Sequence, residues 1–209
     1  MKNVLYSENY QGYEINIKQD PDPQSCLEWD SLGTIATWHR RYNLGHEQPK
    51  ESPAEFISML YKNKAIFLPV YMYDHSGITI STSPFSCNWD SGQLGIIYVT
   101  REKLDDPDFY HFKPKKRIKV AKVKEYLEQE IKTYDQYLTG QVYGFVIKKD
   151  GETIDSCWGF YEDNIETSYC LEEARNLVDC EIKRNRKEHF EQVKTWIRNK
   201  VPLQNRKAL

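Results

Sequence analysis

Long apolar runs are missing from this chain of 209 residues. No stretch approaches the roughly 18 consecutive apolar residues that suggest a membrane-spanning helix. The opening residues, MKNVLYSENY, also lack the apolar core of a signal peptide. We therefore expect a soluble, cytoplasmic protein with no membrane partner.

Paired cysteines are missing as well. The sequence has five cysteines, an odd number with no CxxC pair, and it has no HxxxH motif. A disulfide framework and a zinc finger are both built on such spacings. We therefore expect reduced thiols and disfavour zinc. The five residues are Cys26, Cys87, Cys157, Cys170 and Cys180.

A dominant charge is the third absence. The formal net charge of −2 excludes a general polyanion binder. Charge is nevertheless uneven: residues 20–30 hold four acids and no base, residues 113–124 hold seven bases and no acid, and residues 181–200 hold seven bases against three acids. The basic segments are either solvated helix faces or faces for nucleic acid or an acidic partner. The phosphate-binding candidates are Lys115, Lys116, Arg117 and Lys119.

The hydrophobic pattern predicts an α+β fold. Apolar or alternating runs predict strands at 13–18, 34–39, 66–73, 78–82, 94–100, 142–148 and 153–161, the last two joined by an Asp150-Gly151 turn. Apolar residues three or four apart predict a helix at about 118–138 and a C-terminal helical region with Asn185-Arg186 as a point of interruption. A capping box at Ser52–Glu55 predicts a short helix ending near Lys62. We expect one domain over residues 1–209, a mainly antiparallel sheet covered by two long helices.

Chemically versatile side chains gather between Leu68 and Val99. Asp74 and His75 precede a Ser-Gly turn, and Asp90 lies in a second turn before the next strand. If the flanking strands are neighbours, the two turns meet at one edge of the sheet and form a site for a metal or a proton transfer. Asp74, His75 and Asp90 are therefore the catalytic candidates, and Gln93 is a binding candidate. The alternative is a hydrogen-bond network that only specifies the fold.

Acids on turn-forming backbones suggest a divalent metal. Carboxylate oxygens are the ligands of Mg²⁺ and Mn²⁺, and the candidate ligands are Asp20, Asp22 and Asp74. The alternative is plain turn chemistry, since Asp is common beside Pro and Gly in turns.

Cys87 follows His75 by twelve residues, so a thiolate nucleophile is one interpretation. The other is a buried structural cysteine, because no nucleophile-elbow motif such as GxSxG is present. Two tryptophans close to Ser-Cys pairs, Trp89 and Trp158, are expected in the core.

Residues 38–46, WHRRYNLGH, place two arginines among aromatic rings. Arg40 and Arg41 could clamp a phosphate while a neighbouring ring stacks on a base. Alternatively, the rings belong to the core and the arginines pair with the acids of residues 20–30.

Four strings of the sequence carry a family resemblance: QDPDP…EWDSLGT…HRRYNLG, LPVYMYDHSGITISTSPFSCNWDSGQLGIIYV, TYDQYLTGQVYGFVI and DSCWGFY. They resemble an uncharacterised family of proteins carried by bacteriophages, plasmids and conjugative elements of gut bacteria. The resemblance covers roughly residues 13–161, and DHSG…STSPFSC…WDSGQ is its most specific block. It implies an accessory role in a bacterial host cell, such as anti-CRISPR or anti-restriction activity, and it assigns no catalytic residue.

Three hypotheses about function follow. The first is a counter-defence protein that binds a host defence nucleoprotein or its RNA. The second is a metal-dependent nuclease or phosphoesterase centred on Asp74, His75 and Asp90, with Mg²⁺ or Mn²⁺ as its metal. The third is a nucleotide-binding module without turnover. The sequence does not assign an oligomeric state.

Overall fold

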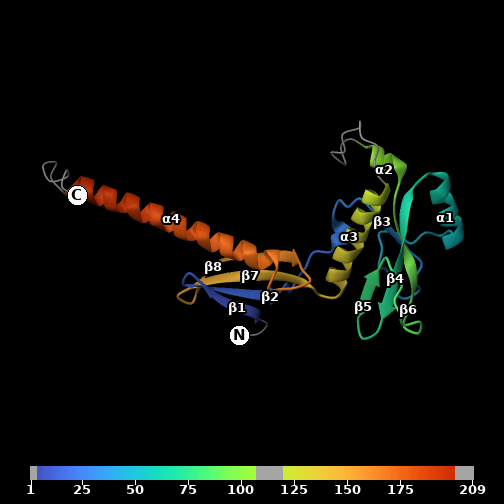
Figure 1. Ribbon diagram of the computed structural model, residues 1–209, viewed down its shortest axis with the longest axis horizontal. Coiled ribbons are helices and arrows are strands. Elements are labelled where there is room, and N and C mark those ends of the chain that lie inside the picture. Colours follow the sequence, from blue (N-terminus) through green and yellow to red (C-terminus); the bar gives the residue numbers. More distant parts are fainter. Residues whose placement is uncertain (1–3, 107–119, 201–209) are drawn as a thin grey trace. The chain divides into compact units, whose positions relative to one another are not determined.

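The computed structural model describes residues 4–106 and 120–200 (Figure 1). It is an α+β structure, as predicted, but its strands form two four-stranded antiparallel sheets rather than one. The chain divides into two compact units, which we call unit 1 (Met1–Asp20 and Tyr143–Leu209) and unit 2 (Pro21–Val142). The single domain over residues 1–209 stays a prediction. No described helix is long and apolar enough to cross a membrane.

Unit 1 is a sheet with one long helix on one face. Its strands are β1 (Val4–Tyr10), β2 (Tyr13–Gln19), β7 (Val142–Lys149) and β8 (Glu152–Tyr161), in the order β1-β2-β7-β8. The helix is α4 (Tyr169–Lys200), and its first turns bury their apolar side chains against the alternating inward residues of β2 and β7. The buried residues at this contact are Ile15, Ile17, Phe145, Ile147, Leu171, Ala174 and Val178.

The hairpin between β7 and β8 turns at Asp150 and Gly151, which have φ values of 52° and 86°. Two residues with positive φ are the requirement of a type I′ turn, so the prediction is confirmed. The predicted interruption of the C-terminal helix is wrong, because α4 is continuous through Asn185 and Arg186. The Asn185 amide donates to Glu181 Oε1 one turn earlier, at 3.1 Å, which is compatible with an uninterrupted helix.

Unit 2 is a sheet with helices on both faces. Its strands are β3 (Thr34–Thr37), β4 (Ile66–Asp74), β5 (Ile78–Ser81) and β6 (Ser91–Val99), in the order β3-β6-β4-β5. The helix α3 (Val120–Leu138) lies along one face (Figure 1). The predicted stripe on α3 is buried there at Val123, Leu127, Ile131 and Tyr134. A 3₁₀ turn (Cys26–Glu28) and a short helix α2 (Arg101–Asp105) complete the unit.

The opposite face of this sheet is covered by α1 (Pro53–Lys62). The predicted capping box is present: Glu55 N donates to Ser52 Oγ at 3.4 Å, and Ser52 N donates to Glu55 Oε2 at 3.0 Å. These reciprocal bonds fix the start of α1, so Phe56 and Leu60 pack under the sheet.

Trp89 and Trp158 do not lie in the core. Trp89 is 95% exposed and Trp158 is 39% exposed. Trp89 lies in the turn before β6, where neither sheet nor helix covers it. Trp158 lies on β8 over Gly144, where a Cβ would come within 2.2 Å of the indole ring. The prediction that both rings are buried is therefore wrong. The tendency of Trp to be buried does not show whether the turn or strand that carries it is covered by another element.

Candidate functional site

The turns that carry Asp74 and Asp90 meet at one end of the unit 2 sheet. β4 and β6 are antiparallel neighbours with Tyr73 opposite Ser91, and Asp74 N donates to Asp90 O at 2.8 Å. Ser76 takes a φ of 60° in the tight turn between β4 and β5. The predicted juxtaposition of Asp74, His75 and Asp90 is therefore what the strand pairing produces.

The side chains at this end form two separate polar pairs. His75 Nδ1 lies 3.2 Å from Asp90 Oδ2. Asp74 Oδ2 instead accepts hydrogen bonds from Arg41 Nη2 at 3.2 Å and from the Tyr42 hydroxyl at 3.0 Å. The bond to Asp74 raises the pKa of Tyr42, because the carboxylate holds the phenol proton. Each candidate carboxylate thus has its own partner, and Arg41 from the 38–46 segment reaches Asp74.

Aromatic rings surround these pairs. The rings of His39 and Tyr42 stack with centroids 5.0 Å apart, and the Arg41 guanidinium lies 5.4 Å from the Tyr42 centroid. The Tyr73 ring stacks on His75 at 5.9 Å. Together with the exposed ring of Trp89 these groups make a surface rich in aromatic and charged side chains. We call it the Trp89 surface, and define it as Arg41, Tyr42, Asp74, His75, Trp89 and Asp90.

Cys87 approaches the acid of this surface rather than the imidazole. Its Sγ lies 4.0 Å from Asp90 Oδ2, the same oxygen that contacts His75. No hydrogen bond joins Cys87 to His75 within the described ranges. A reactive thiolate needs a base or a positive charge beside it. The group beside Cys87 is instead the Asp90 carboxylate, whose negative charge would destabilise a thiolate.

The metal candidates are Asp20, Asp22 and Asp74. Among the residues that the structure describes, no three or more His, Cys, Asp or Glu side chains are placed to hold a metal ion. A site for Mg²⁺ or Mn²⁺ stays a prediction.

The remaining binding candidates have different outcomes. Arg40 is exposed, next in sequence to Arg41 of the Trp89 surface. The Gln93 amide donates to Gly95 O at 3.3 Å, on the same strand. Lys115, Lys116, Arg117 and Lys119 lie outside the described residues.

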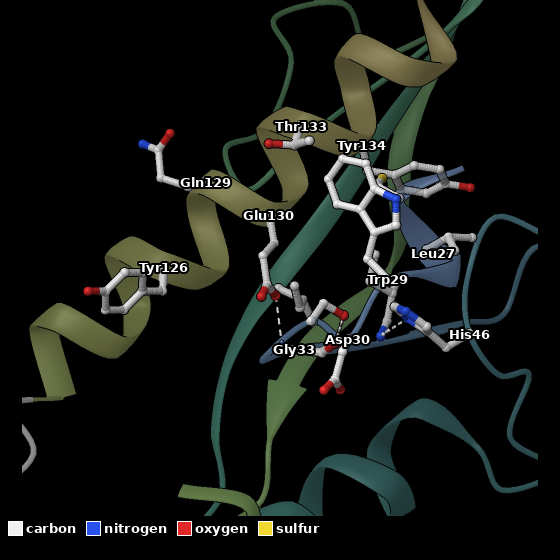
Figure 2. Close-up of a pocket in the computed structure, with 14 residues that line it drawn as sticks. Leu27, Trp29, Asp30, Gly33, His46, Tyr126, Gln129, Glu130, Thr133 and Tyr134 are labelled. Atoms are coloured by element: carbon white, nitrogen blue, oxygen red, sulfur yellow. Dashed lines mark hydrogen bonds between the residues drawn. The ribbon is translucent and has the colours of Figure 1, made fainter. Parts of the chain in front are cut away.

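A hollow of about 270 Å³ lies beside α3 in unit 2 (Figure 2). One wall comes from α3, with Tyr126, Glu130 and Tyr134, and the facing wall comes from residues 26–33. His46, from the loop after β3, also lines it. We call this hollow the α3 pocket.

Glu130 joins the two walls of the α3 pocket. Its carboxylate accepts Leu32 N at 2.6 Å and Gly33 N at 2.7 Å. Burial raises the pKa of Glu130, although these backbone donors and the nearby Lys103 oppose the shift. The carboxylate therefore fastens the 26–33 segment to α3 with two charge-assisted bonds.

Polar groups in the pocket are held in defined protonation states. His46 Nδ1 accepts Ile35 N at 2.9 Å, so the neutral ring carries its proton on Nε2. Burial, followed by the charge of Lys103, lowers the pKa of His46. Burial also raises the pKa of Cys26 to about 11 and that of Tyr134 to about 12. At neutral pH the lining therefore offers a neutral imidazole, a thiol and a phenol.

Sequence reasoning missed the α3 pocket. Its residues come from segments about a hundred positions apart, and their pairing depends on how α3 packs on the sheet. One local signal was present, because Glu130 is an acid next to the apolar stripe residue Ile131. An acid that borders a buried stripe needs a specific donor, here the backbone amides of Leu32 and Gly33.

Comparisons of this chain with protein-family models, with curated proteins and with solved structures found no match.

Proposed function

We propose that this chain is a counter-defence protein of a mobile genetic element, and that it binds a host defence nucleoprotein in the bacterial cytoplasm through the Trp89 surface. The observation that carries the proposal is the exposure of Trp89, which is 95%. Trp, Tyr and Arg are the residue types that dominate the binding energy of protein interfaces. The Trp89 surface contains all three residue types, supplied by the paired ends of β4 and β6 and by the loop at residues 38–46.

The charges of the Trp89 surface favour the protein part of the nucleoprotein over its RNA. Arg41 is paired with Asp74, and His75 lies against Asp90. RNA binding draws on unpaired positive charge, because release of counterions drives it. A surface that balances its own charges gains little from that effect, whereas it suits the core of a protein interface.

The proposal is tested by direct binding of a purified CRISPR effector complex, and separately of its guide RNA, to the immobilised full chain. The effector comes from a host in which the chain suppresses interference. We expect Trp89→Ala to weaken effector binding by about thirtyfold, which corresponds to the roughly 2 kcal/mol of an interface hot spot. The matched control is Trp196→Ala, which removes another exposed tryptophan, on α4 of unit 1.

Two results decide the test. Equal affinity of wild type and Trp89→Ala for the effector contradicts the proposal. Tight binding of the guide RNA alone, with a steep loss of affinity between low and high salt, would show that the chain binds RNA rather than the protein part of the effector.

A second candidate function, a nuclease or phosphoesterase, draws support from one contact. An imidazole held by a carboxylate, as His75 is by Asp90, is the arrangement of an oriented general base. Incubation of the chain with labelled RNA and Mg²⁺ or Mn²⁺ tests it. If the chain is a nuclease or phosphoesterase, RNA should be lost only when a metal is present, and His75→Ala should abolish this loss. RNA that stays intact with both metals rejects this second function.

A further inference from the structure

The charged groups that line the α3 pocket are of one sign. Glu130 and Asp30 are on its walls, and neither Lys nor Arg is among its described lining residues. His46 is kept neutral by burial and by the neighbouring charge of Lys103. An anionic ligand would find no counter-charge in this lining, so the pocket is unsuited to phosphates and carboxylates.

The two carboxylates differ in how far the protein compensates their charge: the charge of Lys103, whose Nζ donates to Ser31 O, already acts on Glu130. Glu130 Oε1 and Oε2 accept backbone N–H groups at 2.6 and 2.7 Å, and these donors carry only partial charges. Asp30 forms no ion pair within residues 4–106 and 120–200. A cation placed in the pocket would therefore interact favourably with Asp30, and with Glu130 in addition to the charge that Lys103 already supplies.

Aromatic rings form much of the remaining lining. Trp29, Tyr126 and Tyr134 all contribute to it, and Trp29 and Tyr126 remain 42% and 38% exposed. In Figure 2, Glu130 reaches in from α3, and Trp29 comes from the facing segment. Cations are attracted to the faces of such rings when they lie within about 6 Å of the centroid.

The apolar groups decide which kind of cation fits. Leu27, Ile35 and Ile97 lie in the lining and cannot replace the water around a bare metal ion or a primary ammonium. A methylated ammonium spreads its charge over apolar methyl groups, so it loses little hydration and gains apolar contact. The volume of about 270 Å³ lies just below the roughly 300–1,000 Å³ of pockets for drug-sized ligands. It therefore suits a small head group.

We propose that the α3 pocket binds a quaternary or methylated ammonium group, with Trp29 and Tyr134 against the methyl groups and Glu130 and Asp30 as the counter-charge. The His46 Nε2–H supplies a donor for a hydroxyl or carbonyl beside the ammonium. Two sources present this chemistry, a free quaternary amine such as choline and a trimethylated lysine side chain of a protein. The proposal is independent of the Trp89 surface, because none of that surface's residues lines the pocket.

The test is isothermal titration calorimetry of the full chain with four probes. Choline is compared with 3,3-dimethyl-1-butanol, which has the same shape without the charge. A short peptide with trimethyllysine is compared with the same peptide carrying unmodified lysine. We expect at least one methylated cation to bind at a single site, and its uncharged or unmethylated counterpart to bind at least tenfold more weakly. The tighter of the two cations identifies the source.

Variants tie this binding to the pocket. We expect Trp29→Ala to weaken binding of the cation by about two- to thirtyfold, the range of one cation–π contact. Asp30→Asn should weaken it without disturbing the fold, because Asp30 is exposed. The matched control is Trp196→Ala, with unchanged affinity expected, and thermal unfolding of each variant checks that it is folded. Failure of both cations to bind overturns the proposal, as does equal affinity for the uncharged isostere or unchanged affinity in Trp29→Ala.

Discussion

Replacing Gly33 with alanine tests the packing that builds the α3 pocket. A Cβ at Gly33 would lie 2.6 Å from Ile97 Cδ1 and 2.7 Å from Glu130 Oε2, far inside van der Waals contact. Gly33 does not have a positive φ, so alanine adds no backbone strain of its own and the cost comes from contacts. Overpacking costs about 1–3 kcal/mol, and displacing Glu130 also weakens its charge-assisted bond to Gly33 N. We expect Gly33→Ala to lower the free energy of unfolding by about 2 kcal/mol.

The matched control for this prediction is Gly92→Ala on β6 of the same unit. No atom lies within 4 Å of a Cβ built at Gly92. Alanine there should leave the stability unchanged or raise it by up to about 1 kcal/mol, because it reduces the freedom of the unfolded chain. The measurement is urea unfolding followed by circular dichroism. Equal stability of Gly33→Ala and Gly92→Ala would refute the close approach of the 26–33 segment to Ile97 and Glu130.

Three further predictions concern stability. Trp89 is 95% exposed, so it buries about 5% of a side chain of roughly 250 Å². Trp89→Ala should therefore lower the free energy of unfolding in urea by only about 0.3 kcal/mol. A loss of several kcal/mol would mean that the ring lies in the core. The hydrogen bonds from Arg175 hold the pKa of Glu8 below its ordinary 4.5, so its stabilisation is present above that pH and is lost as the pH falls through the lowered pKa. The deficit in Tm of Glu8→Gln should therefore shrink in acid, and a constant deficit would contradict the ion pair. Burial raises the pKa of Glu130 above 4.5, so its effect on stability has the opposite pH dependence. The stability of wild type relative to Glu130→Gln should fall as the pH rises from about 4.5 through the raised pKa. A Tm of wild type that instead rises with pH relative to that of Glu130→Gln would contradict the burial of this carboxylate.

Local sequence patterns predicted helices and turns well where a few neighbouring residues determine the backbone conformation. The Ser52–Glu55 box, the Asp150-Gly151 turn and the apolar stripe on α3 each depend on residues a few positions apart. The strand β1 was missed because its outward positions, among them Ser7 and Asn9, leave little apolar contrast in the segment.

The division into two sheets could not be predicted in the same way. β2 pairs with β7, so Ile15 lies opposite Ile147 although more than a hundred residues separate them. Period-2 alternation states that a strand has one buried face, and it does not identify the partner strand. The prediction of one sheet therefore failed at the level of pairing, while nearly every strand in it was correct.

The candidate sites divide along the same line. Asp74 and Asp90 could be placed together because their strands are close in sequence and pair as neighbours. The contact of Arg41 with Asp74 and the clamp of Glu130 on Gly33 depend on loop and helix packing, which periodicity does not describe.

The most direct test of the proposed function is the efficiency of plating of a targeted phage on host cells that express the chain. The hosts form a panel of gut bacteria, each carrying a CRISPR or restriction system directed against that phage. Our account predicts that wild type and Trp196→Ala restore plaques in at least one host, and that Trp89→Ala does not, at equal protein levels. Full restoration by Trp89→Ala, or no restoration by wild type in any host, would contradict the account.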